Sequence, residues 1–129
     1  MDRSEYRQEL ARAYFQRGDV ALHKEDYDKA LADLDQAIQF DPEYPEAYDH
    51  RGHVYLSRDE LVKALADFDR SIRFGPAYGA STYQGRGVAH LRKGNLHEAL
   101  ADFSKCIELR PNNAHAYQGR GVAHLRKGN

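Results

Sequence analysis

Three five-residue stretches, KALAD at residues 29–33, KALAD at 63–67 and EALAD at 98–102, recur at intervals of 34 and 35 residues. The prolines at 42, 76 and 111 have the same spacing. So do the glycines at 18, 52, 87 and 121, which add one further interval of 34 residues. The one extra residue falls near Gly79, in a loop between units where an insertion is well tolerated. Self-similarity at a period of this length is typical of architectures built from repeated supersecondary units.

The C-terminal part of the chain contains a longer identity. Residues 83–95 and 117–129 both read YQGRGVAHLRKGN, so thirteen consecutive positions are the same. Chance does not produce such an identity, and we infer a recent duplication or a deliberate assembly of one unit.

Each unit is predicted to form two helices. Apolar or small residues recur at three- and four-residue steps between Pro45 and Arg58 and between Ala80 and Lys93. Breaks at 25–26, 59–60 and 94–95 separate this helix from a second, more amphipathic one, which the proline of the unit ends. Because no stretch shows sustained period-two alternation, the sequence predicts an all-α fold.

The glycines at 18, 52, 87 and 121 stand in the middle of the first helices, where glycine costs about 1 kcal/mol relative to alanine. A repeated cost at one position indicates a packing requirement. We expect these glycines to face Ala30, Ala64 and Ala99 on the second helices, with Leu34, Phe68 and Phe103 filling the space beside the contact. Gly85 and Gly119 are expected to point toward a ligand instead.

The units resemble tetratricopeptide repeats in the order of their characteristic residues. These are an aromatic residue, a glycine, an alanine, a second aromatic residue or a leucine, a small residue and a proline. In the second unit these are Tyr48, Gly52, Ala64, Phe68, Ser71 and Pro76, with Tyr55 as a further aromatic residue between the glycine and the alanine. The resemblance implies a right-handed α-solenoid over a single domain, residues 1–129. Its expected parts are repeats at 11–44, 45–78 and 80–113 and a half repeat at 114–129.

The resemblance also implies that the first helices line a concave groove that binds a protein or peptide partner. The groove residues expected from this alignment are Arg12, Phe15, Asp19, Asp49, His50, His53, Gln84, Val88, Arg92, Gln118, Val122 and Arg126. This surface would be acidic near the N-terminus and basic, with small apolar patches, near the C-terminus. Family members that clamp acidic chaperone tails use lysines, asparagines and an arginine, where this chain has Phe15, Asp19, His50, Ser81 and Gly85. We therefore expect no chaperone-tail clamp.

Several residues have both a chemical and a packing interpretation. His50 and His53 lie three positions apart, with Asp49 beside them, but the pair lacks an assured third ligand, and no metal site is predicted. The arginines at 17, 51, 86 and 120, one before each glycine, form either a basic ladder or ion pairs with nearby carboxylates. His90, His124 and Cys106 are expected to be buried packing residues.

Composition restricts the remaining classes of function. A net charge of −1 and a pI near 6.6 argue against a nucleic-acid binder, although residues 1–64 carry −6 and residues 65–129 carry +5. No run of eighteen apolar residues or apolar leader is present, so we expect a cytoplasmic protein without membrane contact. No catalytic motif is recognisable, and we expect neither enzymatic activity nor a cofactor.

The leading hypothesis is thus a scaffold that binds a peptide or a helix of a partner in the groove. The alternative is a self-assembling module. Residues 114–128 are expected to form a first helix without a hairpin partner, which would expose Tyr117, Gly121 and His124 for a homo-oligomer.

Overall fold

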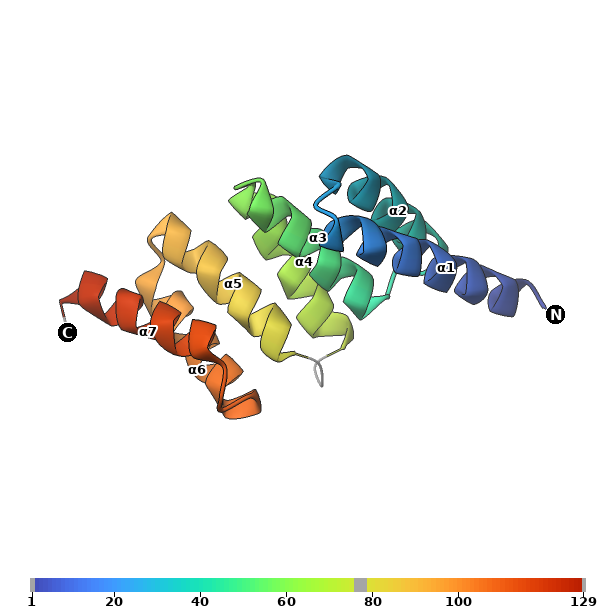
Figure 1. Ribbon diagram of the computed structural model, residues 1–129. Helices are drawn as coiled ribbons and strands as arrows, with labels where there is room; N and C mark the ends of the chain where they lie inside the picture. Colours follow the sequence, from blue (N-terminus) through green and yellow to red (C-terminus); the bar gives the residue numbers. More distant parts are fainter. Residues whose placement is uncertain (1, 76–78, 129) are drawn as a thin grey trace.

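Seven helices make up the part of the chain that the structure, a computed structural model, describes: residues 2–75 and 79–128. They are α1 (Arg3–His23), α2 (Tyr27–Phe40), α3 (Pro45–Ser57), α4 (Leu61–Phe74), α5 (Ala80–Lys93), α6 (Leu96–Leu109) and α7 (Ala114–Lys127). Helices α1 and α2, α3 and α4, and α5 and α6 pack as hairpins, and α7 packs on α6 at the end of the stack opposite α1 (Figure 1). Every element in the described ranges is helical, which confirms the all-α prediction.

The turn at the end of each first helix uses a left-handed backbone at one repeated position. Glu25 and Asp59 have φ of 58° and 59°, and Gly94 and Gly128 have φ of 83° and 85°. The predicted breaks lie at these turns and are confirmed. Glycine adopts this conformation without the steric conflict that a Cβ atom brings, so the turn after α5 is less strained than its counterparts after α1 and α3.

Each glycine of the repeated position in the first three hairpins lies against a large side chain of the second helix. A Cβ atom added to Gly52 would lie 2.7 Å from Phe68 Cε1, and one added to Gly18 would lie 3.1 Å from Leu34 Cγ. Leu34, Phe68 and their counterpart Phe103 are completely buried. The atoms nearest these glycines thus belong to the leucine or the phenylalanine ring, which were predicted to fill the space beside the contact.

Gly85 and Gly119 also contact these rings. A Cβ atom on Gly85 would lie 2.5 Å from Phe68 Cζ and 2.8 Å from His53 Cε1, and one on Gly119 would lie 2.4 Å from Phe103 Cζ. The expectation that these two glycines face a ligand is therefore wrong. The Phe68 and Phe103 rings each lie between two successive first helices. Each of those helices has a glycine at the point where a Cβ atom would collide with the ring.

The arginine before each of the first three repeated glycines connects the two helices of its hairpin. Its guanidinium donates two hydrogen bonds of 2.7 to 3.0 Å to a carboxylate sixteen positions later, in the pairs Arg17–Asp33, Arg51–Asp67 and Arg86–Asp102. The three aspartate residues are at most 4% exposed. Such bidentate, charge-assisted hydrogen bonds are strong and directional. Of the two interpretations of these arginines, pairing with carboxylates is confirmed for these three residues.

The small-residue position of the second helices holds Ala37, Ser71 and Cys106, all at most 2% exposed, as predicted. Burial raises the pKa of the Cys106 thiol, which lowers its reactivity. His90 is half-buried, with Nδ1 3.2 Å from Asn95 Nδ2. His124 on α7 is exposed, so its predicted burial is wrong.

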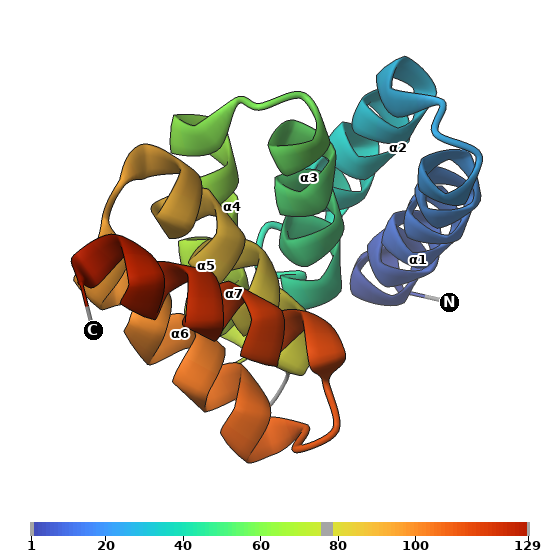
Figure 2. The ribbon, with the colours of Figure 1, turned by 60° about the vertical axis from the view of Figure 1, so that its left-hand side comes forward.

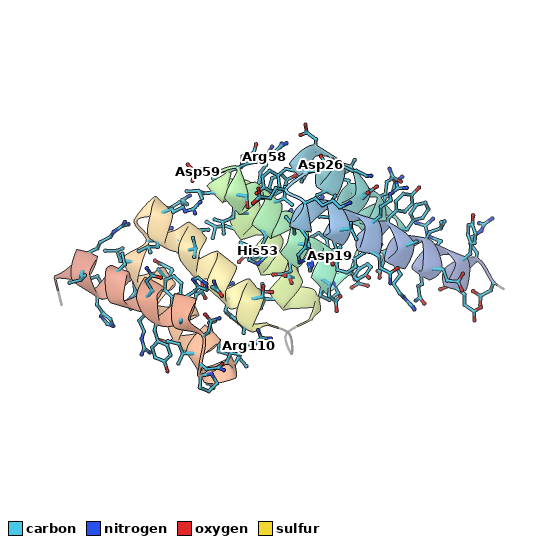
Figure 3. All side chains as sticks on the ribbon, viewed as in Figure 1. Asp19, Asp26, His53, Arg58, Asp59 and Arg110 are labelled. Carbon is cyan, nitrogen blue, oxygen red and sulfur yellow. The ribbon has the colours of Figure 1, made fainter. Side chains whose placement is uncertain are left out.

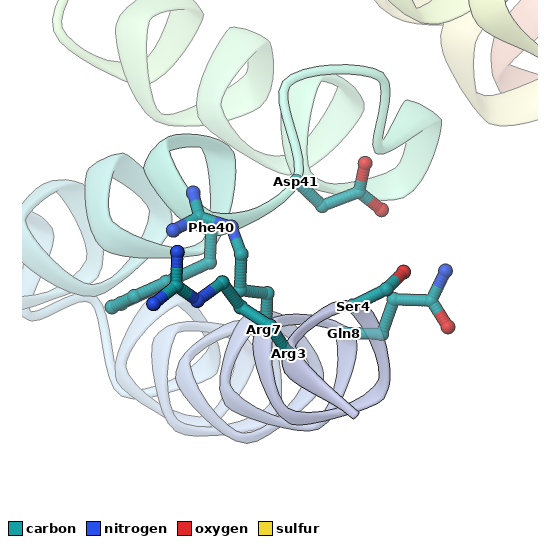
Figure 4. Close-up of a pocket in the computed structure, with 6 residues that line it drawn as sticks. All are labelled: Arg3, Ser4, Arg7, Gln8, Phe40 and Asp41. Atoms are coloured by element: carbon teal, nitrogen blue, oxygen red, sulfur yellow. The ribbon is translucent and has the colours of Figure 1, made fainter. Parts of the chain in front are cut away.

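Helix α1 begins at Arg3, eight residues before the expected start of repeat one. Arg7 Nη2 donates to the Gln39 carbonyl oxygen over 3.0 Å, and its guanidinium lies 5.3 Å from the centre of the Phe40 ring. Figure 4 shows these side chains in a hollow of about 460 Å³ that is also lined by Arg3, Ser4, Gln8 and Asp41. A repeat period does not predict this extension, because no other unit has it. None of the described helices is long and apolar enough to cross a membrane.

Candidate binding surface on the first helices

The first helices α1, α3, α5 and α7 are neighbours in that order and form one side of the molecule (Figure 2). We call this surface the first-helix face. All the predicted groove residues belong to these four helices. The structure brings together the predicted residues of α1 and α3. Several of the predicted residues of α5 and α7 instead bond to or pack against neighbouring parts of the chain.

Asp19, Asp49, His50 and His53 form a polar cluster between α1 and α3, which we call the His–Asp cluster. His50 Nε2 lies 2.9 Å from Asp19 Oδ1, and His50 Nδ1 lies 3.6 Å from Asp49 Oδ2. His53 Nε2 lies 3.4 Å from Asp49 Oδ1. Figure 3 shows Asp19 and His53 on these neighbouring helices. The cluster joins two repeats through polar side chains that are 13 to 35% exposed, and so remain within reach of a ligand.

Helix α5 completes the cluster. Thr82 Oγ1 donates to Asp49 Oδ1 over 2.7 Å, and His53 Nε2 lies 3.1 Å from Ser81 Oγ. Burial of Asp49 by itself raises its pKa, but the interactions with His53, Thr82 and His50 outweigh burial, and the pKa of Asp49 lies below its ordinary value. Asp49 is therefore a carboxylate at neutral pH. Thr82, only 3% exposed, was not predicted as a site residue, because only the packing of α5 on α3 places it beside Asp49.

An aromatic hollow adjoins the cluster on the α1 side. The Phe15 ring lies 5.1 Å from the Tyr44 ring and 4.7 Å from the His50 ring, centre to centre. The hollow measures about 510 Å³, and its lining consists of Gln8, Arg12, Phe15, Asp41, Tyr44, Pro45 and Glu46. Arg12 and Phe15 were predicted from the sequence. Gln8, Asp41 and Tyr44 were not, and they extend the hollow from the start of α1 and the loop before α3.

A second, smaller hollow of about 170 Å³ lies on the α5 side of the cluster. It is lined by Pro45, Glu46, Asp49, Ser71, Gly79, Ala80, Ser81, Thr82 and Arg110. Pro45 and Glu46, the first residues of α3, border both hollows. The candidate site is therefore a pair of hollows on either side of the start of α3, next to the His–Asp cluster.

The predicted groove residues of α5 and α7 lie apart from this site. Arg92 Nη1 donates to the Leu56 carbonyl oxygen over 3.0 Å, and Arg126 Nη1 donates to the Leu91 carbonyl oxygen over 3.1 Å. These two arginines thus join the ends of successive first helices. The Gln84 side chain accepts a hydrogen bond from Asn113 Nδ2 over 3.0 Å.

The remaining three predicted residues are apolar or exposed. Val88 is half-buried and packs against two of the hydrophobic clusters, and Val122 is half-buried on α7. Gln118 is exposed on α7. Val88 therefore serves the interior more than a ligand.

The cluster does not have the geometry of a metal centre. Within residues 2–75 and 79–128, no group of three or more histidine, cysteine, aspartate or glutamate side chains is arranged to hold a metal ion. The histidines of the cluster lie instead against the carboxylates of Asp19 and Asp49.

Comparison with family models gives two matches, one described as TPR repeat over residues 11–59 and one described as Tetratricopeptide repeat over residues 80–113. The chain belongs to the tetratricopeptide repeat family. The two matches include most of the first three hairpins, and seven described helices correspond to about three and a half tetratricopeptide repeats. No curated protein matches the chain.

Solved tetratricopeptide structures are similar over nearly the whole chain. The Arabidopsis OM64 TPR domain is 21% identical, with a TM-score of 0.88 over 93% of this chain and 98% of that one. The first TPR of Spaghetti (RPAP3), bound to the HSP90 peptide SRMEEVD, is 22% identical, with a TM-score of 0.89 over 95% of this chain and 96% of that one. The second TPR domain of human RPAP3, in complex with the HSP70 peptide SGPTIEEVD, is 22% identical, with a TM-score of 0.79 over 93% and 97%. At these identities the similarity shows the fold, a right-handed α-solenoid, as predicted.

Proposed function

We propose that this tetratricopeptide domain is a protein-interaction module that binds a peptide segment of a partner on the first-helix face, across the two hollows beside the His–Asp cluster. One observation carries the proposal: an aromatic hollow around Phe15 adjoins a group of carboxylates on the same face. Binding is proposed because solenoids of stacked helical repeats present extended surfaces to their partners.

The charges around the larger hollow favour a basic peptide. Asp41 and Glu46 line the larger hollow with Arg12 as the only cation of that lining, and Asp19 and Asp49 lie next to it. A Lys or Arg side chain beside an apolar or aromatic one would place its charge near the carboxylates and its neighbour against Phe15. Complementary charge of this kind gives specificity and speeds association.

The same charges disfavour the acidic chaperone tails. Phe15, Asp19, His50, Ser81 and Gly85 occupy the positions used by the family's carboxylate clamp. Among them, Gly85 is packed against Phe68, and Asp19 adds negative charge. Although the TPR domains of RPAP3 named above were solved with peptides ending in EEVD, we propose that this chain does not bind such tails.

Peptide selection followed by direct binding measurements tests the proposal. A positional peptide library should select Lys or Arg together with an aromatic or large aliphatic residue, and fluorescence polarisation then measures the selected peptide and SRMEEVD. Phe15→Ala should weaken the selected peptide about fivefold or more, since buried aromatic anchors typically contribute more than 1 kcal/mol. The matched control is Val62→Ala, a 70% exposed apolar residue on α4, which should leave binding unchanged. Selection of acidic peptides, tighter binding of SRMEEVD, or equal affinities for both variants would contradict the proposal.

Homo-oligomer formation through Tyr117, Gly121 and His124 is the second candidate function. It is favoured by the 45% exposure of Tyr117. Light scattering on the intact chain tests it: a monomeric mass at high concentration excludes the assembly, whereas a dimer that Tyr117→Glu dissociates supports it.

A further inference from the structure

Three histidines lie against two aspartates on the first-helix face. His23 ends α1, and its Nδ1 lies 3.4 Å from Asp19 Oδ1. It thus adjoins the His–Asp cluster, in which His50 Nε2 lies 2.9 Å from the same oxygen. Asp19 Oδ1 is buried and accepts no hydrogen bond among the described residues. Both imidazoles are therefore in position to neutralise its charge when they carry a proton.

Both ring nitrogens of His50 face oxygen atoms. Nδ1 lies 2.9 Å from the Glu46 carbonyl oxygen, and Nε2 lies 2.9 Å from Asp19 Oδ1. A neutral imidazole has one N–H group and one lone pair, so one nitrogen of a neutral His50 places its lone pair against an oxygen. The protonated ring has two N–H groups, one for each oxygen. A proton on His50 thus strengthens the contact between α3 and α1.

His53 lies against the other aspartate. Its Nε2 is 3.4 Å from Asp49 Oδ1 and 3.1 Å from Ser81 Oγ, a hydroxyl group that can donate or accept a hydrogen bond. Burial raises the pKa of Asp49, but the contacts with His53, Thr82 and His50 lower it further, below its ordinary value. The Asp49 carboxylate therefore keeps its charge over the pH range in which histidines titrate.

The ionisable groups around the two hollows determine the charge of this surface. Besides the three histidines they are four carboxylates and two guanidinium groups: Arg12 and Asp19 of α1, Asp41 of the loop before α3, Glu46 and Asp49 of α3, and Arg110 after α6. Helix α5 contributes the hydroxyl groups of Ser81 and Thr82. These groups carry a net charge of −2 while the three histidines are neutral and +1 when all three are protonated.

We propose that protonation of His23, His50 and His53 regulates the site: the domain binds its basic peptide at about pH 7.5 and releases it at about pH 5.5. The protonated rings compete with the Lys or Arg of the peptide for the carboxylates of Asp19 and Asp49, and they repel its positive charge. The inference rests on the proposed function, since it concerns the peptide that binds across the two hollows.

Fluorescence polarisation over a pH series measures the effect. One probe is the labelled Lys- or Arg-containing peptide selected for the first-helix face, and the other is the same peptide with that Lys or Arg replaced by Gln. The affinity of the basic peptide should fall about tenfold or more between pH 7.5 and pH 5.5. The affinity of the Gln analogue should change about twofold or less, because a neutral side chain does not respond to the charge of the surface.

Two sets of three substitutions separate the charge of the site from the total charge of the chain. A chain with His23→Gln, His50→Gln and His53→Gln takes up no protons at the cluster, so its affinity at pH 5.5 should stay close to that at pH 7.5. The matched control has His97→Gln, His115→Gln and His124→Gln, at exposed positions of α6 and α7. It changes the total charge equally and should keep the full pH dependence.

NMR signals of the histidine Cε1–Hε1 groups give a second readout, which uses the unmodified chain. Coupling between two binding equilibria is reciprocal, so a peptide that is released by protons must in turn displace protons. Saturating basic peptide at pH 6.5 should therefore lower the protonated fraction of His50 and His53 and leave that of His115 unchanged.

The outcomes distinguish the two proposals. If the basic peptide does not bind at pH 7.5, the proposed function is refuted, and this inference with it. If it binds equally at pH 7.5 and pH 5.5, or if both variant sets keep the same pH dependence, this inference alone is refuted. Equal pH dependence of the basic peptide and its Gln analogue also refutes it, because acid would then act on the fold rather than on the charge of the surface.

Discussion

Replacing Gly87 and Gly121 by alanine, one at a time, gives a direct test of how this fold is packed. The two glycines stand at the same place in two identical stretches of thirteen residues. Alanine therefore changes the intrinsic helix propensity equally at both positions, by about 1 kcal/mol in favour of the helix. The difference between the two variants measures tertiary packing alone.

The expected magnitude follows from the surroundings of each glycine. A Cβ atom added to Gly87 would lie 2.9 Å from Phe103 Cε1 and 3.0 Å from Cδ1, and this ring is completely buried. Overpacking of this type typically costs about 1–3 kcal/mol, which matches or exceeds the gain in propensity. At Gly121 nothing lies within 4 Å, so the gain remains. We expect Gly87→Ala to be less stable than Gly121→Ala by about 1–3 kcal/mol.

Urea denaturation followed by far-UV circular dichroism measures this difference. Low micromolar protein keeps association through α7 from contributing. The dependence of the unfolding free energy on urea should be the same for both variants, because a change in that slope would indicate a different unfolded or native state. Equal shifts of the two midpoints, in the same direction, would refute the packing of Phe103 against Gly87.

Three further predictions follow from the same structure. Gly52→Leu should lower the free energy of unfolding by about 3 kcal/mol or more, because its Cβ atom alone would lie 2.7 Å from the Phe68 ring; a melting temperature equal to that of the unmodified chain would contradict this. Arg51→Met should cost about 1–3 kcal/mol in urea denaturation, because it leaves the buried Asp67 carboxylate short of two hydrogen bonds, and adding Asp67→Asn should restore part of the loss. Because the pKa of Asp49 is lowered in the folded state, its charge stabilises the fold above the ordinary value of 3.8, and this contribution disappears as the pH falls through the lowered pKa. Unfolding measured over a pH series should therefore show the stability difference between the unmodified chain and Asp49→Asn closing in acid, and a constant difference would be inconsistent with the role of Asp49.

The interaction surface was only partly predictable. Phe15, Asp19, Asp49, His50 and His53 were placed on one face from helical spacing and the family resemblance, and the structure gathers them there. Thr82 and Tyr44 were missed because they reach the site from α5 and from the loop before α3. Arg92 was expected in the groove but bonds to the end of α3, a contact that depends on how far successive hairpins are rotated.

The period, the helices and the turns of this tetratricopeptide array could be predicted from the amino-acid sequence. These features depend on residues close together in the chain, such as the prolines and the three- and four-residue apolar spacing. The packing of the helices was needed to show which glycine contacts which ring, which carboxylate pairs with which arginine, and which copy of YQGRGVAHLRKGN is covered. Identical residues there have identical local preferences, yet one copy packs against α6 through Arg86 and Gly87, and the other leaves Arg120 and Gly121 open. Side-chain contacts between helices depend on the residues across the interface, and the local sequence does not contain that information.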